Sequence, residues 1–394
     1  MRKNHIRTFC TLLLAFLLLI TAGCAGAEKS IVLTFTGDCT LGSEETTRAR
    51  EDSFDTLATK KGYGYFFANF REMFEQDDQT VINFEGVLSD SRNQKSNSKR
   101  YCFRGPTDFA KILTGSSIEA CSLSNNHTAD FGKQGEDSTK TTLDANGIGW
   151  FQNAKNYIYE KDGIRIAFIA TDNKYVFNQF DKIKKTISSL KEKGEAHFVV
   201  ICWHTGMEYH GQHEPNTESI CRKMISFGAD LIVINHPHVL QGIGVYNNRC
   251  VFYSLGNFVF GGNSAIRTES YKYTTVSSLY TMVVQVRLLF TDDGRYLGQQ
   301  PVIYPAYTSN AAPVNNYQPY RVSPEEAVPV REALQADTPF ELPEITVGAD
   351  GLSKIELSYL AAFDDVEIPE NEPNSPQGVP EAPSPTVTRS TRSR

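Results

Sequence analysis

Residues 31–42 read IVLTFTGDCTLG, an apolar run of six residues that is followed by Gly37 and Asp38. A short run rich in β-branched and aromatic residues, closed by a glycine, predicts a buried β-strand with a carboxylate just past its end. Similar runs recur along the chain. The predicted strands cover residues 31–36, 80–83, 118–122, 164–170, 197–203, 231–235 and 250–255.

Helical segments separate these predicted strands. They cover residues 65–75, 108–114, 135–146, 182–193 and 217–227. Strands that alternate with helices indicate an α/β domain. Residues 279–290 and 297–304 predict an antiparallel hairpin through the turn Asp292-Asp293-Gly294, and residues 323–336 predict one more helix.

The composition is that of a globular protein. The chain has 394 residues, of which 40% are hydrophobic and 22% are charged, and its formal net charge is −7. Because no basic excess exists to neutralise the phosphates of a duplex, we expect no nucleic-acid partner. Residues 364–394 are rich in Pro, Glu, Ser and Thr, which predicts a disordered tail.

The first 27 residues have the pattern of an export signal. Basic residues precede an apolar run over 9–20, and small residues follow it. The run is too short to span a membrane comfortably. Two processing routes remain open. Residues 21–24 resemble a lipobox with Cys24 as the lipidated residue, although Thr21 replaces the usual aliphatic side chain; residues 25–27 fit simple cleavage and secretion. We favour a lipoprotein anchored in the membrane and exposed at the cell surface.

Six cysteines lie beyond the signal, and no two of them have the C-x-x-C spacing of a thiolate metal site. A chain of this size does not need a disulfide framework. We therefore predict buried free thiols at Cys39, Cys102, Cys121, Cys202, Cys221 and Cys250.

Side chains that bind metals follow most of the predicted strands. In open α/β sheets, ligands bind beyond the carboxyl ends of the strands, so these side chains should converge on one edge. Oxygen and imidazole donors without thiolates suit divalent metals, and their number exceeds the needs of one tetrahedral ion. Two ions sharing a carboxylate, about 3.5–4 Å apart, are typical of phosphoester hydrolysis. The residues are Asp38, Glu85, Asn126, His127, His204, His236 and His238.

Seven blocks of sequence, in the same order, resemble the bacterial CapA family of capsule or poly-γ-glutamate synthesis proteins. They are GDCTLG (37–42), INFEGVLSD (82–90), FRGP (103–106), SLSNNHTADFGKQG (122–135), CWHTGMEY (202–209), INHPHVLQG (234–242) and YSLGNFVF (253–260). The resemblance covers about residues 31–262. It implies a calcineurin-like metallophosphatase fold, a four-layered αββα sandwich. From their own β-rich pattern, residues 263–350 are expected to pack on the same domain.

The resemblance also implies roles for individual residues. Two divalent ions (Mn, Fe, Zn or Mg) would be held by Asp38, Glu85, Asn126, His204, His236 and His238. His127 would act on the leaving group, and Asp130 would orient it, since a carboxylate fixes the tautomer of an imidazole. Arg104, Glu208 and Asn257 fall in family motifs and are expected to bind substrate.

Three departures from calcineurin-like enzymes put hydrolysis in doubt. Thr40 replaces the His of the usual Asp-x-His, Glu85 replaces a bridging Asp, and Asn235 replaces the Gly before His-Pro-His. A metallophosphatase fold therefore does not guarantee phosphatase activity.

Two functions stay open from the sequence. The favoured one is an exported protein that acts in the synthesis, export or anchoring of a capsule-type polymer, and contacts the anionic polymer or its synthesis machinery. The alternative is an active metal-dependent phosphoesterase or hydrolase on an envelope polymer or phosphoester.

Overall fold

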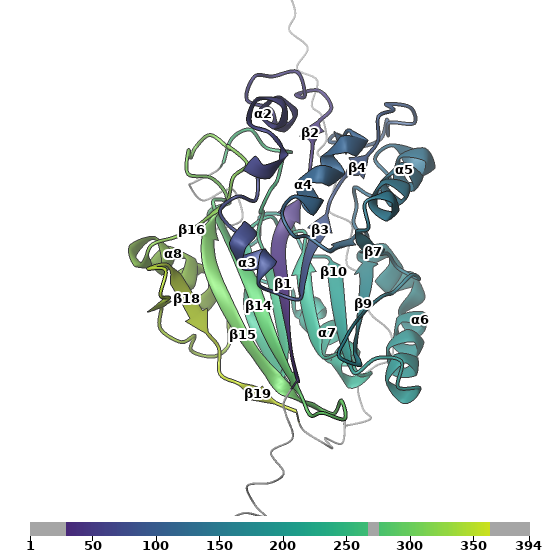
Figure 1. Ribbon diagram of the computed structural model, residues 1–394, viewed down its shortest axis with the longest axis vertical. Coiled ribbons are helices and arrows are strands. Elements are labelled where there is room, and N and C mark those ends of the chain that lie inside the picture. The colour runs from purple at the N-terminus through teal and green to yellow at the C-terminus, as the bar shows by residue number, and fades with distance from the viewer. Residues whose placement is uncertain (1–28, 267–275, 363–394) are drawn as a thin grey trace, which may run out of the picture.

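The computed structural model describes residues 29–266 and 276–362, and it confirms a mixed α/β fold with several sheets (Figure 1). The predicted signal over 1–27, with Cys24, and the predicted tail over 364–394 lie outside the described residues. The α-helices are α2 (Phe54–Lys61), α3 (Arg71–Glu75), α4 (Ala110–Thr114), α5 (Gly132–Ala145), α6 (Asn173–Glu192), α7 (Pro215–Ser226) and α8 (Pro324–Gln335). Short 3₁₀ turns cover Tyr63–Tyr65 and Thr107–Phe109.

The first large sheet has the strand order β17-β18-β15-β14-β1-β3-β6-β7, with β16 and β19 also paired to β15. Strands β1, β3, β6 and β7 are parallel, whereas β14 runs antiparallel to β1. The bounds are β1 (Lys29–Cys39), β3 (Gln79–Phe84), β6 (Ala120–Ser122), β7 (Gly149–Phe151), β14 (Tyr280–Phe290), β15 (Tyr296–Tyr307), β16 (Tyr320–Arg321), β17 (Thr346–Val347), β18 (Ser353–Glu356) and β19 (Leu360–Ala361).

The second large sheet has the order β12-β13-β11-β10-β9-β8, in which β9, β10, β11 and β13 are parallel. Its strands are β8 (Tyr157–Lys161), β9 (Ile164–Asp172), β10 (Phe198–His204), β11 (Leu231–Asn235), β12 (Leu240–Tyr246) and β13 (Arg249–Leu255). A small third sheet contains β2 (Ser43–Glu44), β4 (Val87–Leu88) and β5 (Phe103–Gly105).

Strand β10 shows how the core is organised, because its successive side chains point to opposite faces of the sheet. Phe198, Val200 and Cys202 join a buried cluster that also contains Leu33 and Phe35 of the first sheet. Val199, Ile201 and Trp203 join a second cluster with residues of α6 and α7. A third cluster joins the first sheet to α2 and α4. Each sheet therefore buries both faces, which explains the near-continuous apolar runs of the sequence.

The seven predicted strands and the hairpin are confirmed, and two helix predictions were wrong in their extent. Only Arg71–Glu75 of the predicted 65–75 helix is α-helical. Residues 66–70 form a turn that packs Phe66 against Phe54, and Phe67 and Phe70 against Phe258. Helix α6 begins at Asn173 rather than at residue 182, since the side chain of Asp172 accepts a hydrogen bond from the Tyr175 N–H at 2.7 Å.

The chain after residue 262 contributes to the first sheet. Strand β14 pairs with β1 from Lys29↔Phe290 to Phe35↔Val284, and β15 pairs with β14. Figure 1 shows α8 beside β15 and α6 beside β9, at opposite sides of the molecule. The six cysteines predicted as buried free thiols are confirmed as such. Within 29–266 and 276–362, no helix combines the length and apolar content needed to cross a membrane.

Candidate metal centre

The parallel strands of both large sheets end at a common edge, which we call the carboxyl edge. Asp38 lies at the end of β1, Glu85 directly after β3, and His204 at the end of β10. His236 and His238 follow β11, so segments nearly 200 residues apart in sequence meet here: the His236 N–H lies 3.3 Å from Asp38 Oδ2. These strand ends converge on one edge, as the sequence predicts.

Glu85 is at the centre of the carboxyl edge. Its side chain is 0% exposed, and its Oε1 lies 3.8 Å from His127 Nε2, 3.8 Å from His204 Nε2 and 3.9 Å from His238 Nε2. No donor among the described residues hydrogen-bonds this oxygen. Leaving a buried acceptor without a hydrogen bond costs about 1–3 kcal/mol, and more when the acceptor is charged. The oxygen is therefore free to accept a ligand, and three imidazoles face it.

Two groups of side chains place their ligand atoms within 4.8 Å of one another: Glu85 with His236 and His238, and Glu85 with Asp38 and His204. Both groups include Glu85. The Nδ1 atom of His236 is a second buried polar atom without a hydrogen-bond partner. Carboxylate and imidazole donors in this arrangement fit a divalent cation, and each group could hold one.

Asp38 is fixed by close backbone packing between the two large sheets. Its N–H donates to the Gly256 carbonyl at 2.9 Å, and its carbonyl accepts from the Phe258 N–H at 2.9 Å. A Cβ at Gly37 would lie 2.2 Å from the Gly256 carbonyl oxygen, so only glycine permits this approach. The carboxylate then accepts a hydrogen bond from Asn83 Nδ2 at 2.7 Å.

The turn over residues 236–238 is strained. His236 has φ 112° and His238 has φ 59°, in the left-handed region that side chains other than glycine seldom adopt. Such residues cost about 1–3 kcal/mol each and cluster at functional sites. The strained turn aims His238 inward, where Nδ1 lies 2.9 Å from Asn257 Oδ1 and 3.3 Å from Asp38 Oδ2, with Nε2 toward Glu85.

Burial and crowding shift the pKa values of these groups in opposite directions. Burial, reinforced by Asp38, raises the pKa of Glu85 well above its ordinary value, and burial lowers the pKa of His204 well below its own. Burial and the neighbouring His238 lower the pKa of His236 to about 4. Burial alone would lower the pKa of His238, but the negative charges of Glu85 and Asp38 outweigh burial, and the pKa of His238 is raised well above its ordinary value. A bound cation would compete with protons for these side chains.

His127 is held by Asp130, which lies in the same loop between β6 and α5. Its Nδ1 lies 2.7 Å from Asp130 Oδ2, an oxygen that also accepts from the Phe103 N–H at 2.7 Å. Lys99 Nζ lies 2.7 Å from the other oxygen of Asp130. Such a partner fixes the tautomer with hydrogen on Nδ1 and leaves Nε2 to face the centre.

The three residues predicted to bind substrate are placed differently. Asn257 is buried against His238, as described above. Glu208 is exposed; its charge adds to the rise in the pKa of Glu85 and partly offsets the lowering of the pKa of His236. Arg104 is buried, and its guanidinium donates to the Ser89 carbonyl at 2.5 Å and lies 3.3 Å from Glu45 Oε2. Its side-chain contacts among the described residues include none of the candidate metal ligands.

Asn126, the remaining predicted ligand, is exposed, and its Oδ1 lies 2.9 Å from His204 Nε2. Sequence reasoning did not assign roles to Asn83, Asn125 or Lys99. Asn83 Nδ2 lies 3.3 Å from His204 Nδ1, and Asn125 Oδ1 accepts from the His127 N–H at 3.0 Å. Both asparagines adjoin predicted ligands in the blocks 82–90 and 122–135, which is a usable signal. Lys99 lies in no motif.

Comparison with known proteins bears on this arrangement. The family model described as bacterial capsule synthesis protein PGA_cap matches residues 32–262. The capsule biosynthesis protein CapA of Bacillus anthracis is 29% identical over 257 residues, covering 59% of this chain and 60% of that protein. The PGA biosynthesis protein CapA of Bacillus subtilis (strain 168) is 29% identical over 281 residues, covering 66% of this chain and 73% of that protein.

The match therefore spans about 60% of the length of the Bacillus anthracis relative. Among solved structures, a hypothetical protein from Thermus thermophilus aligns with a TM-score of 0.41 and 13% identity, over 70% of this chain and 99% of that one.

Proposed function

Because this chain belongs to the bacterial capsule synthesis protein family PGA_cap, we propose that it acts on an anionic, capsule-type envelope polymer of the poly-γ-glutamate kind. Its part would be in the synthesis, export or anchoring of the polymer, in contact with the polymer or its synthesis machinery. The names of the two Bacillus relatives support this class of role.

The proposal includes a four-layered αββα architecture of the metallophosphoesterase type. Its support is the set of buried clusters, in which one cluster joins the two large sheets and two further clusters join each sheet to helices. In this architecture the carboxyl edge of both sheets would form the working surface of the protein.

The proposal places two divalent cations at the carboxyl edge, with Glu85 shared between them. The observation that carries it is the buried Oε1 of Glu85, which accepts no hydrogen bond from the described residues and lies 3.8–3.9 Å from three imidazole nitrogens. The holding residues would be Asp38, Glu85, Asn126, His204, His236 and His238. When bound, such cations supply Lewis acidity and attraction for carboxylate or phosphate oxygens.

His127, positioned by Asp130, would accept or donate a proton beside that centre. Asp130 keeps hydrogen on Nδ1 of His127, so Nε2 is the atom that exchanges a proton with a bound group. Hydrolysis of a phosphoester is the alternative function that the same geometry would allow, and the names of the relatives do not favour it. Manganese-dependent hydrolysis of a generic phosphodiester that is lost in His127→Ala would establish it.

Export, with a lipid on Cys24, completes the proposal and rests on the sequence of residues 1–27. The intact mass of the protein from its native membranes tests it. An acylated chain that begins at Cys24 is the expected product. A chain that begins at Glu28 would contradict the lipid anchor, and a chain that begins at Met1 would contradict processing altogether.

Complementation tests the function. In the organism that makes this protein, deletion of the gene should lower the amount of acidic polymer at the cell surface. Wild-type protein should restore it, and Glu85→Gln, expressed at an equal level, should not. Full restoration by Glu85→Gln would contradict a role for the metal centre, and an unchanged amount of polymer after deletion would contradict the function itself.

A further inference from the structure

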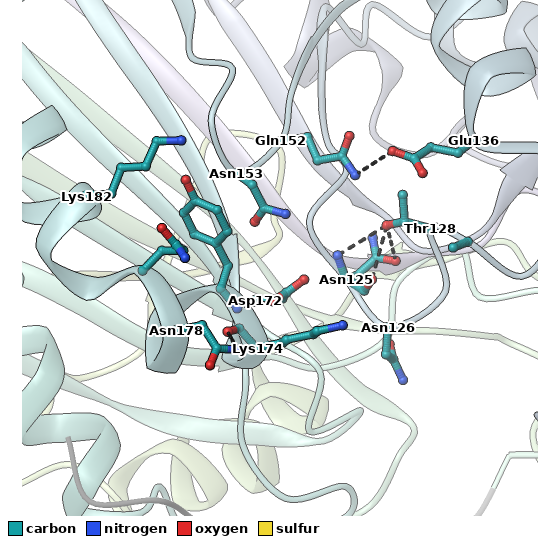
Figure 2. A pocket seen from close by; sticks show the side chains of 13 residues that line it. Asn125, Asn126, Thr128, Glu136, Gln152, Asn153, Asp172, Lys174, Asn178 and Lys182 are labelled. Atoms are coloured by element: carbon teal, nitrogen blue, oxygen red, sulfur yellow. Dashed lines mark hydrogen bonds between the residues drawn. The ribbon is translucent and has the colours of Figure 1, made fainter. Parts of the chain in front are cut away.

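A pocket of about 660 Å³ adjoins the candidate metal centre, between the loop after β6 and the first turns of α6 (Figure 2). Asn126 belongs to both, because it lines the pocket and its Oδ1 lies 2.9 Å from His204 Nε2. In Figure 2, Lys174 extends toward Asn126 from the opposite wall. A chain lying in the pocket would thus continue directly to the metal centre.

Carboxamides dominate the lining of this pocket. A carboxamide has one carbonyl acceptor and two N–H donors, the groups that pair with an amide of another chain. Part of this capacity is used within the protein, because Asn125 donates to the Phe84 carbonyl at 2.8 Å and Gln152 donates to Glu136 at 3.0 Å. One aromatic ring, that of Tyr175, lines the pocket as well. The six carboxamide residues of the lining are Asn125, Asn126, Gln152, Asn153, Asn178 and Gln179.

The lining carries two lysines and two carboxylates, and the lysines are the more exposed of the four. Its two carboxylates are engaged within the protein: Asp172 accepts from the Tyr175 N–H at 2.7 Å, and Glu136 pairs with Lys140 at 2.6 Å. Lys174 and Lys182, by contrast, form no salt bridge with a carboxylate of the described residues. Both are exposed, and Lys182 Nζ lies 5.9 Å from the centre of the Tyr175 ring. The pocket therefore offers two cations to anionic groups of a ligand.

We propose that this pocket binds a stretch of an acidic polyamide chain and presents its next residue to the metal centre. Lys174 and Lys182 would pair with carboxylates of the polymer, and the carboxamides would hydrogen-bond its amide groups. This inference rests on the proposed function, since it assigns the polymer a binding site beside the proposed metals.

A binding assay with a defined probe tests the site. The probe is a short γ-linked oligoglutamate, and the variant is Lys174→Gln/Lys182→Gln in the mature protein. We expect affinity to fall roughly 5- to 30-fold at low salt, as two exposed ion pairs allow. Lys184→Gln/Lys185→Gln is the matched control, because it makes the same charge change on exposed positions of α6 outside the lining. The control should bind as wild type does.

Two further probes define the chemistry. A γ-linked oligoglutamine keeps the amides and lacks the charges, so it should bind more weakly than oligoglutamate and be insensitive to the lysine changes. An oligogalacturonate keeps the carboxylates on a sugar chain. Tighter binding of oligogalacturonate than of oligoglutamate would overturn the polyamide class, and equal affinity of both lysine variants for oligoglutamate would overturn the site.

The outcomes separate this inference from the proposed function. If oligoglutamate does not bind, or binds to both lysine variants alike, while Glu85→Gln still fails to restore surface polymer, the pocket proposal falls and the function stands. If deletion of the gene leaves surface polymer unchanged, the function falls whatever the probe does.

Discussion

Carboxylates lie at both ends of the parallel strands in the first sheet, half-buried at the amino end and buried at the carboxyl edge, and their partners differ. At the amino end, Glu119 precedes β6 and its Oε2 accepts the Thr80 N–H at 2.8 Å. Asp78 precedes β3 and accepts the Val32 N–H at 2.8 Å, with Lys161 paired at 2.5 Å. At the carboxyl edge, Glu85 Oε1 accepts no hydrogen bond from the described residues and faces imidazoles.

This difference separates a structural role from a ligand-binding role. Burying a carboxylate is expensive, and backbone N–H groups or a lysine offset that cost at the amino end. At the carboxyl edge the facing groups are imidazoles, whose Nε2 atoms lie 3.8–3.9 Å from Glu85 Oε1 and so beyond hydrogen-bond distance. Burial lowers the pKa of His204 and His236, which disfavours their charged forms. A shared divalent cation would satisfy the carboxylates and the imidazoles together.

The largest effect is expected at the strained turn of the carboxyl edge. His236→Gln/His238→Gln keeps size and polarity but removes two imidazole ligands, so metal affinity should fall more than about 100-fold, beyond the range for an outer-shell partner. The fold should persist, because the large cores do not need an ion to form. Elemental analysis beside circular dichroism measures both. Unchanged metal content in a folded variant would remove these residues from the site.

A smaller effect is expected from a residue that orients ligands without being one. Asn83 Nδ2 donates to Asp38 at 2.7 Å and lies 3.3 Å from His204 Nδ1, so Asn83→Ala should lower metal affinity by about 10- to 100-fold. Titration of the metal-free protein with Mn²⁺ or Zn²⁺ measures this change. An affinity equal to that of wild type would show that Asp38 and His204 need no such support.

The smallest effect is expected at the amino end and depends on pH. Burial raises the pKa of Glu119 from 4.5 to about 7. Between these values the native state binds more protons than the unfolded state, so Glu119 lowers stability as pH rises through that window. Glu119→Gln should therefore raise the free energy of unfolding at pH 8 by about 1 kcal/mol, discounted for partial exposure, and leave it unchanged at pH 4. Denaturant unfolding at both pH values measures this; equal gains at pH 4 and pH 8 would contradict the assigned ionisation.

The strand ends could be predicted because their signal is local. Seven apolar runs predicted the strands, and parallel strands must end together, so Asp38, Glu85 and His204 could be placed at one edge before any coordinates. The antiparallel hairpin was equally visible from its turn residues.

Other features depend on contacts that no local pattern shows. Lys99 reaches Asp130 from a loop without a motif, and Arg104 is engaged by Glu45 although its block suggested substrate binding. The pocket combines carboxamides from separate loops with lysines of α6, a helix whose first turns were not predicted. Side chains from separate segments meet there only through tertiary packing.

Metal stoichiometry in Glu85→Gln beside Glu119→Gln tests the central claim most directly. Both changes neutralise a carboxylate of the same sheet, at opposite ends of its parallel strands. The account predicts that wild type and Glu119→Gln retain the same number of divalent ions after purification, whereas Glu85→Gln loses them while keeping its circular dichroism spectrum. Equal metal content in a folded Glu85→Gln, or a metal-free wild type that takes up no divalent ion on titration, would contradict it.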